Sequence, residues 1–371
     1  MIQDDLQYKI GLTLIKGVGP VLAKNLLAYL GSAKNIFYEK KQHLSKIPGI
    51  GDFLAREITS QDVMKRAEQE VEFTLKNNIQ VHFFADKTYP YRLKECNDSP
   101  VVLYYKGNKD LNESRFLSIV GTRNATDYGK ELCKAFIQEI SQKQPNITII
   151  SGLAYGIDIC AHKFTLESGM STIGVLGHGL DRIYPSAHRP TAVKMLEKGG
   201  LLSEYTSGTT PDRQNFVQRN RIIAGMSDAI VVIESAEKGG ALITAELGND
   251  YNRDVFAIPG RVNDEWSKGC NKLIKENKAA LIQTPEDLLH FMNWETVTNN
   301  VSEIQTSLFL DLTSDEVEVI EELRNRPNGV NVNELTVKLN IPYSKLSSRL
   351  LDMEFKGLVK CLPGGMYKIV R

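Results

Sequence analysis

The chain has 371 residues, 42 % hydrophobic and 24 % charged, a composition typical of a globular protein with about two or three domains. Its 45 basic and 45 acidic residues give a formal net charge of zero, so a polyanion would have to bind at a local basic patch. Five scattered cysteines argue against a disulfide scaffold or a zinc site, and no apolar run approaches the roughly 18 residues of a membrane span, so we expect a cytoplasmic protein without a membrane partner.

Residues 1–80 contain two similar segments. Gly17-Val18-Gly19 precedes a helical run over 21–30, and Gly49-Ile50-Gly51 precedes one over 53–59. The glycines permit a tight turn between helices. This pattern resembles tandem helix-hairpin-helix motifs, in which the turn amides hold a DNA phosphate. A helical packing domain without DNA contact remains an alternative, because 11 basic and 9 acidic residues do not decide between them.

Residues 81–293 alternate short apolar runs with helical stretches. The apolar runs cover 116–120, 147–151, 172–176, 200–203, 229–233 and 254–258. The helical stretches cover 129–140, 156–166, 189–197 and 241–249. Nearly continuous apolar strands separated by helices indicate a mostly parallel sheet covered on both faces. We therefore predict an α/β fold, with one Rossmann-like doubly wound domain over 81–293.

The last part of the chain reads as a linker and a small domain. Residues 294–310 are polar and weakly patterned, which is typical of a linker. Residues 311–371 contain helical patterns near 315–325, 332–339 and 344–356, then a hairpin signal around Pro363-Gly364-Gly365. Three helices and a hairpin predict a winged helix. Its 9 basic and 9 acidic residues leave both DNA and protein contact open.

Three loops follow predicted strands and share one expected edge of the sheet. They hold Gly121-Thr122-Arg123, the segment from Ser151 and Gly152 to Gly156, and Lys238-Gly239-Gly240. Glycine-rich loops that enter helices offer backbone amides to phosphate, and Arg123 and Lys238 add full charges. One such loop alone would suggest only a tight turn. Three at the carboxyl ends of parallel strands favour an anion site.

The segment Arg219-Asn220-Arg221 offers a further phosphate-binding group, because the arginine fork suits bidentate contacts. Residues two apart on a helix do not share a face, so we expect one arginine at the site and the other in a structural ion pair. Asp158 and His162 are spaced as a general acid–base pair, although a capping aspartate and a buried histidine explain them equally. The absence of the phosphate-loop and dinucleotide motifs argues against a Walker ATPase and predicts no cofactor.

Taken together, the domain closely resembles the DNA-processing protein DprA (Smf) family. The resemblance rests on ordered blocks of sequence: Tyr89-Pro90, Pro100–Gly107, Ile119–Arg123, Ser151–Asp158, Gly174–Gly177, Arg219–Gly225, Leu242–Ala245 and Val255–Gly260. Two departures from the family pattern, at Val217-Gln218 and at Gly239-Gly240, weaken the expected phosphate contacts.

The resemblance implies a non-enzymatic protein that binds single-stranded DNA in a basic pocket. It implies that this protein protects incoming strands and loads the RecA recombinase onto them in natural transformation, and that it forms a homodimer. By the family pattern, four basic side chains would line the pocket: Arg123, Arg219, Arg221 and Lys238.

Two other function classes remain as alternatives. The segment Gly239 to Glu246 also resembles the loop of Rossmann phosphoribohydrolases, where a carboxylate such as Glu246 assists cleavage. Release of free base from a nucleoside monophosphate would identify such an enzyme. A protein-interaction adaptor is the third hypothesis, and failure to bind any oligonucleotide at low salt would favour it.

Overall fold

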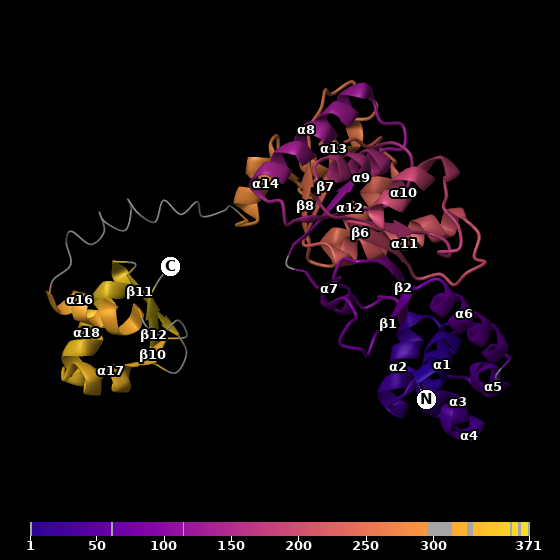
Figure 1. Cartoon of the computed structure of the whole chain (residues 1–371), viewed down its shortest axis with the longest axis horizontal. Helices are drawn as coiled ribbons and strands as arrows, with labels where there is room; N and C mark the ends of the chain where they lie inside the picture. Colours follow the sequence, from indigo (N-terminus) through magenta and orange to yellow (C-terminus); the bar gives the residue numbers. More distant parts are fainter. Residues whose placement is uncertain are drawn as a thin grey trace. The chain divides into compact units, whose positions relative to one another are not determined.

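The computed structural model describes residues 2–60, 62–113, 115–294, 314–324, 329–356, 358–362 and 365–369. The chain forms two compact units, Met1–Thr296 and Val297–Arg371 (Figure 1). The linker predicted over 294–310 lies outside the described residues from residue 295 onward.

The first unit begins with six helices: α1 (Ile2–Leu14), α2 (Pro20–Leu30), α3 (Ala33–Tyr38), α4 (Lys41–Leu44), α5 (Asp52–Ser60) and α6 (Met64–Lys76). Both glycine turns have left-handed backbone, with φ of 83° at Gly17 and 85° at Gly49. A Cβ on Gly17 would lie 2.9 Å from Leu54 of α5, and one on Gly49 would lie 2.8 Å from Leu22 of α2. Each turn therefore packs against the helix that follows the other turn, which makes the two motifs a reciprocal pair.

The remainder of this unit surrounds a nine-stranded sheet. Its strands in chain order are β1 (Gln80–Phe83), β2 (Val102–Gly107), β3 (Phe116–Val120), β4 (Thr148–Ser151), β5 (Thr172–Leu176), β6 (Gly199–Ser203), β7 (Ala229–Val232), β8 (Asp254–Ala257) and β9 (Ala280–Leu281). Their order across the sheet is β1-β2-β6-β5-β4-β3-β7-β8-β9. The strands from β3 to β9 are parallel, whereas β1 and β2 are antiparallel additions at one edge.

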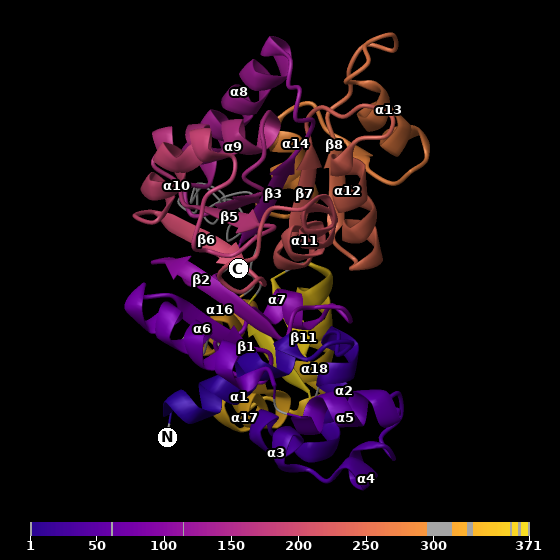
Figure 2. The ribbon, with the colours of Figure 1, turned by 90° about the vertical axis from the view of Figure 1, so that its right-hand side faces the viewer.

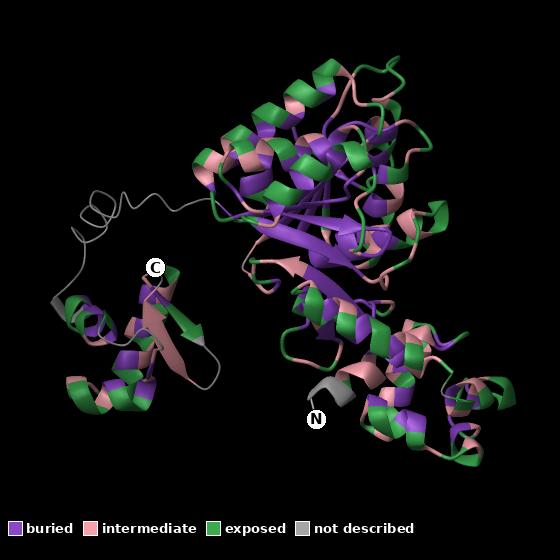
Figure 3. Ribbon diagram, turned by 45° about the vertical axis from the view of Figure 1, so that its right-hand side comes forward, coloured by how far each residue is buried: buried purple, intermediate pink, exposed green. Residues whose placement is uncertain are grey.

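Helices cover both faces of this sheet, as Figures 1 and 2 show. They are α7 (Tyr91–Lys94), α8 (Asp127–Lys143), α9 (Ile157–Glu167), α10 (Arg189–Met195), α11 (Arg213–Met226), α12 (Gly240–Asp250), α13 (Lys268–Lys275) and α14 (Pro285–Phe291), with a 3-10 turn at Ser186–His188. Along β3, Phe116 and Val120 pack toward α11 and α12, while Leu117 and Ile119 pack toward α8 and α9. Alternate residues of a strand point to opposite faces, and all four are buried because helices cover both faces. Figure 3 shows the buried strands between helices whose outer sides are exposed.

The strand order fixes where a ligand can approach. From β3 the chain winds outward through β4 and β5 to β6, then returns to place β7 on the other side of β3. Ligands of doubly wound sheets bind in the crevice beyond the carboxyl ends of the strands at such a reversal. This topology confirms the predicted Rossmann-like α/β fold and directs attention to the loops after β3 and β7.

The second unit contains α16 (Ser314–Arg324), β10 (Val330–Asn331), α17 (Val332–Leu339), α18 (Tyr343–Phe355), β11 (Val359–Leu362) and β12 (Met366–Ile369). The strands form a sheet in the order β10-β12-β11. Apolar residues of the three helices described in this unit, among them Val319, Leu335 and Leu350, form its core. The arrangement confirms the predicted winged helix.

Candidate functional site

A groove of about 600 Å³ opens at the carboxyl ends of β3 and β7. One wall is the β3–α8 loop with Gly121, Thr122 and Arg123, and the opposite wall is the β7–α12 loop with residues 236–240. Helix α11 lies along the groove between these loops and contributes Arg213, Phe216, Val217, Arg219, Asn220 and Ile223. The reversal of the sheet therefore carries a cavity lined mainly by two of the three glycine-bearing loops, while the third contributes Ala154.

The groove is rich in cations. Arg123, Arg213, Lys238 and Lys272 line it with exposed side chains, and Arg219 lines it from a buried position. The carboxylates on its lining are Asp158, Glu237 and Glu246, of which Asp158 is buried beside Arg219. Since the four exposed cations face only two exposed carboxylates, the groove favours an anion although the whole chain is neutral.

The loop that carries Arg123 is fixed by Glu234 at the end of β7. The backbone N–H of Thr122 donates to the Glu234 carbonyl at 2.7 Å. The Glu234 carboxylate, 5 % exposed, accepts from the Thr126 backbone N–H at 2.9 Å and from its hydroxyl at 2.5 Å. The backbone is therefore held in place while the Arg123 side chain projects into the groove.

Arg219 forms part of the floor of the groove. It is 4 % exposed and donates a hydrogen bond to the Val175 carbonyl at the end of β5. Burial lowers the pKa of Arg219, and burial raises the pKa of Asp158, while the opposite charge of each partner offsets part of the other's shift. A Cβ on Gly152 would lie 2.3 Å from the Arg219 guanidinium and 2.4 Å from the Asp158 carboxylate, so only glycine leaves room for this pair.

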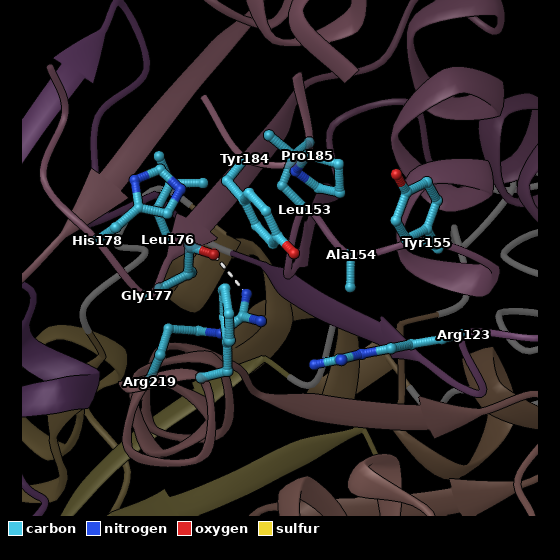
Figure 4. A pocket seen from close by; sticks show the side chains of 12 residues that line it. Arg123, Leu153, Ala154, Tyr155, Leu176, Gly177, His178, Tyr184, Pro185 and Arg219 are labelled. Carbon is cyan, nitrogen blue, oxygen red and sulfur yellow. Dashed lines mark hydrogen bonds between the residues drawn. The ribbon is translucent and has the colours of Figure 1, made fainter. Parts of the chain in front are cut away.

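A second, smaller pocket of about 140 Å³ adjoins the groove and shares Arg123, Ala154, Phe216 and Arg219 with it (Figure 4). Its remaining lining is mostly apolar or aromatic: Leu153, Tyr155, Val175, Leu176, Gly177, His178, Tyr184 and Pro185. The Tyr184 and Phe216 rings stack with centroids 5.8 Å apart, and the Arg123 guanidinium lies 5.7 Å from the Phe216 ring. We call this cavity the aromatic pocket.

The sequence-predicted site residues divide into two groups. Those that line the groove are Gly121, Thr122, Arg123, Arg219, Asn220, Lys238, Gly239 and Gly240. Ser151, Gly152 and Gly156 lie beneath it. The Ser151 hydroxyl donates to the Ile119 carbonyl at 2.6 Å, and a Cβ on Gly156, whose φ is 77°, would lie 2.1 Å from the Thr122 carbonyl oxygen. Ser151, Gly152 and Gly156 thus support the phosphate-binding candidates from below, and Ala154 is the residue of this loop that reaches the groove.

Arg221 corrects one expectation, because it is absent from the lining of both cavities. Its guanidinium forms an ion pair with Glu204 and donates to the Asp98 carbonyl at 2.7 Å. Successive residues of an α-helix are rotated by about 100°, so Arg221 points about 160° away from Arg219. Arg219 faces the groove and Arg221 is a structural group, which is the division expected for two arginines at this spacing.

Sequence reasoning missed other cations and rings of the groove: Arg213, Phe216, Trp266 and Lys272. A signal was present for α11. Asp212 caps this helix by accepting from the Gln214 N–H at 2.7 Å, and from that start Arg213, Phe216 and Asn220 follow at i, i+3 and i+7 on one face. Trp266 and Lys272 carry no comparable signal, since only the tertiary fold brings them to the groove.

Comparison with known proteins decides the family. The family model described as DNA recombination-mediator protein A matches residues 80–293, and protein Smf of Synechocystis is 38 % identical over 78 % of this chain and 73 % of its own length. The chain belongs to the DNA recombination-mediator protein A (DprA) family. The flanking regions match a tandem helix-hairpin-helix model over 10–61 and the DprA winged helix domain over 310–365. These matches confirm the family resemblance seen in the sequence.

Solved structures of similar proteins agree with this DprA assignment. DNA processing protein A of Streptococcus pneumoniae superposes with a TM-score of 0.67 at 32 % identity, over 76 % of this chain and 97 % of that one. DNA processing protein A of Helicobacter pylori superposes with a TM-score of 0.53 at 27 % identity, over 58 % and 96 %. The latter structure is described as giving insight into that protein's single-stranded DNA binding mode.

The described residues were also expected to lack a membrane span and a metal site. None of the helices in the described part of the chain has the length and apolar character needed to cross a membrane. Within the same residues, no group of three or more His, Cys, Asp or Glu side chains could hold a metal ion. Glu246, the carboxylate of the alternative hydrolase hypothesis, lies on α12 with its side chain 57 % exposed and 3.5 Å from the Lys278 ammonium.

The Asp158–His162 pair has a structural explanation. His162 is fully buried, its Nε2–H donates to the Gly152 carbonyl at 2.5 Å, and its Nδ1 lies 2.7 Å from the Thr172 hydroxyl. Burial lowers the pKa of His162 from 6.5 to about 4. The neutral imidazole thus ties the loop after β4 to β5, and both members of the pair support the floor of the groove.

This burial predicts a pH-dependent loss of stability. Between pH 6.5 and about 4 the unfolded chain protonates His162 while the folded chain does not, so the free energy of unfolding falls as the pH drops through that window. The full contribution of His162 is about 3 kcal/mol as an upper limit. Urea unfolding from pH 7 to 4.5 should give a shallower pH dependence for His162→Gln than for the wild type. The exposed His290→Gln is the control, and equal slopes for wild type and His162→Gln would refute the role of burial.

Proposed function

We propose that this protein binds single-stranded DNA in the groove and inserts a base into the adjoining aromatic pocket. The observation that carries the proposal is the continuity of the two cavities, which share Arg123, Phe216 and Arg219. Single-stranded nucleic acids are bound by a cationic path for the backbone together with aromatic surfaces for the bases. The groove supplies the first of these chemistries and the aromatic pocket supplies the second.

The backbone of the strand would run between the β3–α8 and β7–α12 loops. Gly239 caps the start of α12 without a side chain of its own, so the first amides of this helix are open to a phosphate. Arg123 and Lys238 stand on opposite walls and supply full charges, while Asn220 adds an amide from α11. Several groups from different elements therefore converge on a single path for an anion.

A base in the aromatic pocket would contact the Phe216 ring and the apolar wall of Leu153, Leu176 and Pro185. Arg123 stands at the junction, over the Phe216 ring and on the lining of both cavities. Its guanidinium can therefore contact a phosphate in the groove or stack on the inserted base. Inserting a base from a duplex would first cost its pairing and stacking, so the same pocket disfavours duplex DNA.

Family membership supports this assignment, since the chain matches the recombination-mediator model over its central domain. It also supports a second step, in which the protein acts as a homodimer that protects incoming strands and passes them to RecA during transformation. The measurement for this step is RecA filament formation on oligo-dT already coated by a single-strand-binding protein. Addition of this protein should shorten the lag, and an unchanged lag would contradict the loading step. Light scattering would test the dimer.

Alanine substitutions at two walls of the groove test the site. Arg123→Ala and Lys238→Ala should each weaken oligo-dT binding by about tenfold, the equivalent of about 1.4 kcal/mol, because each removes one charge from the anion path. Both side chains are exposed, so stability should change by less than about 0.5 kcal/mol. Fluorescence anisotropy gives the affinities and urea unfolding gives the stabilities.

Lys198→Ala provides the matched control for these substitutions. Lys198 is also exposed, but it directly precedes β6 and therefore lies at the opposite edge of the parallel strands from the groove. Its substitution should leave oligo-dT affinity unchanged. The site assignment fails if Arg123→Ala and Lys238→Ala bind as tightly as this control.

The salt dependence of binding should report the number of phosphates in the groove. If the four exposed cations each neutralise one phosphate, the slope of log affinity against log salt should be near −3, from roughly −0.7 per phosphate on a single strand. The zero net charge of the chain cannot produce this slope through long-range attraction. Titrations of oligo-dT at salt concentrations from about 50 to about 300 mM measure this slope. A slope near zero would rule out phosphate binding by these loops.

A further inference from the structure

The loop between β6 and α11, residues 204–212, is clamped by a helix of the N-terminal helical region. Glu70 of α6 is 1 % exposed, and its carboxylate accepts from the Ser207 backbone N–H at 2.9 Å and from the Ser207 hydroxyl at 2.5 Å. Arg66 donates to the Glu70 carboxylate at 2.8 Å and to the Ser207 carbonyl at 2.5 Å. We call these three residues the Glu70 clasp. It closes within the first compact unit, where α6 lies beside β2 (Figures 1 and 2).

The loop depends on such polar anchors for its position. No residue of 204–212, all of which the structure describes, is buried, so the loop has no apolar side chain in the core. Apart from the Glu70 clasp, Glu204 pairs with Arg221 of α11 at the start of the loop, the Gly208 N–H donates to Asp181 at 3.1 Å, and the Gly179 N–H donates to the Thr209 carbonyl at 3.3 Å. At the middle of the loop, the buried Glu70 carboxylate makes the most contacts, because it accepts two hydrogen bonds from Ser207 and one from Arg66.

Both walls of the aromatic pocket connect to this loop. At its end Asp212 caps α11, and Arg213 and Phe216 follow directly in the first turn. At its middle it bonds to Gly179 and Asp181, which lie in the segment between the pocket residues His178 and Tyr184. A shift of the loop would therefore move the Phe216 ring and the opposite wall together.

The same N-terminal region reaches the second half of α11 through another contact. Lys24 of α2 donates to the Ser99 hydroxyl at 2.6 Å and to the Asn97 carbonyl at 3.0 Å. The neighbouring Asp98 carbonyl accepts from Arg221 of α11 at 2.7 Å. The N-terminal region thus supports both halves of α11 indirectly, through Ser207 and through residues 97–99, although none of its residues lines the groove or the aromatic pocket.

We propose that Glu70 is a positioning residue for the DNA site and that it sets the placement of Phe216 and Arg213 through Ser207. The N-terminal helical region thereby controls DNA affinity without contacting DNA. This inference rests on the proposed function. Coupling between sites is reciprocal, so a bound strand in turn stabilises the clasp.

Glu70→Gln in the full chain tests the clasp, because glutamine keeps the shape and removes the charge. Oligo-dT affinity should fall by at least about fivefold, the lower end of energetic coupling between sites. The salt slope should stay unchanged, since no phosphate contact is lost. Backbone amides of residues 207–216 should exchange hydrogen faster in the absence of DNA. Glu72→Gln, an exposed carboxylate on the same helix, is the matched control and should change none of these quantities.

Ser207→Ala supplies the second variant. It removes the two bonds of the hydroxyl, to Glu70 and from Arg66, but keeps the backbone bonds of Ser207. It should therefore show the same effects at smaller size, and it carries the test alone if Glu70→Gln does not fold. The double variant should bind no more weakly than Glu70→Gln, because both changes break one unit. The positioning role of Glu70 would be refuted if these variants kept wild-type exchange rates and wild-type affinity while Arg123→Ala lost affinity. Unchanged affinity in Arg123→Ala would instead refute the proposed DNA site, and the exchange rates would still decide the clasp.

Discussion

The reversal of winding between β3 and β7 is the constraint on which the remaining structure of the site depends. Adjacent parallel strands end at the same edge of the sheet. The loop after β3 and the loop after β7, which leads into α12, therefore face each other, and α11 lies along the crevice between them. No side-chain interaction is needed to create the crevice. The side chains then decide what it accepts, and here they supply cations on the walls and a buried arginine on the floor.

Helix α11 links this crevice to the rest of the first unit. Arg213, Phe216 and Asn220 face the groove, Ile222 and Ile223 pack into the core against the sheet, and Arg221 pairs with Glu204. The helix therefore cannot rotate without losing either buried apolar contacts or an ion pair. This fixed orientation explains why a groove formed partly by exposed, flexible side chains can still present a defined path to a ligand.

Much of the fold follows from local sequence, because the buried parallel strands are nearly continuous apolar runs. The runs at 116–120 and 172–176 coincide with β3 and β5. The antiparallel edge strands β1 and β2 are missing from the predicted runs, and their direction is set by the chain connection, which a local apolar pattern does not reveal. The glycines and basic side chains of two loops, those with Arg123 and with Lys238, were enough to predict their place at the candidate site. The supporting role of Gly152 and Gly156 depends on what packs against them, namely Arg219 and the Thr122 carbonyl, which the sequence does not reveal.

In the proposed mode of binding, a single strand binds because its backbone and a base can occupy the groove and the aromatic pocket together. The most direct measurement is competition between labelled oligo-dT and unlabelled competitors of equal length, single-stranded or blunt duplex, on the full chain at fixed salt. The account predicts that the single strand displaces the label at least about tenfold more effectively, because a paired base must be unstacked at a cost of a few kcal/mol before it enters the pocket. Equal or better displacement by the duplex would contradict it.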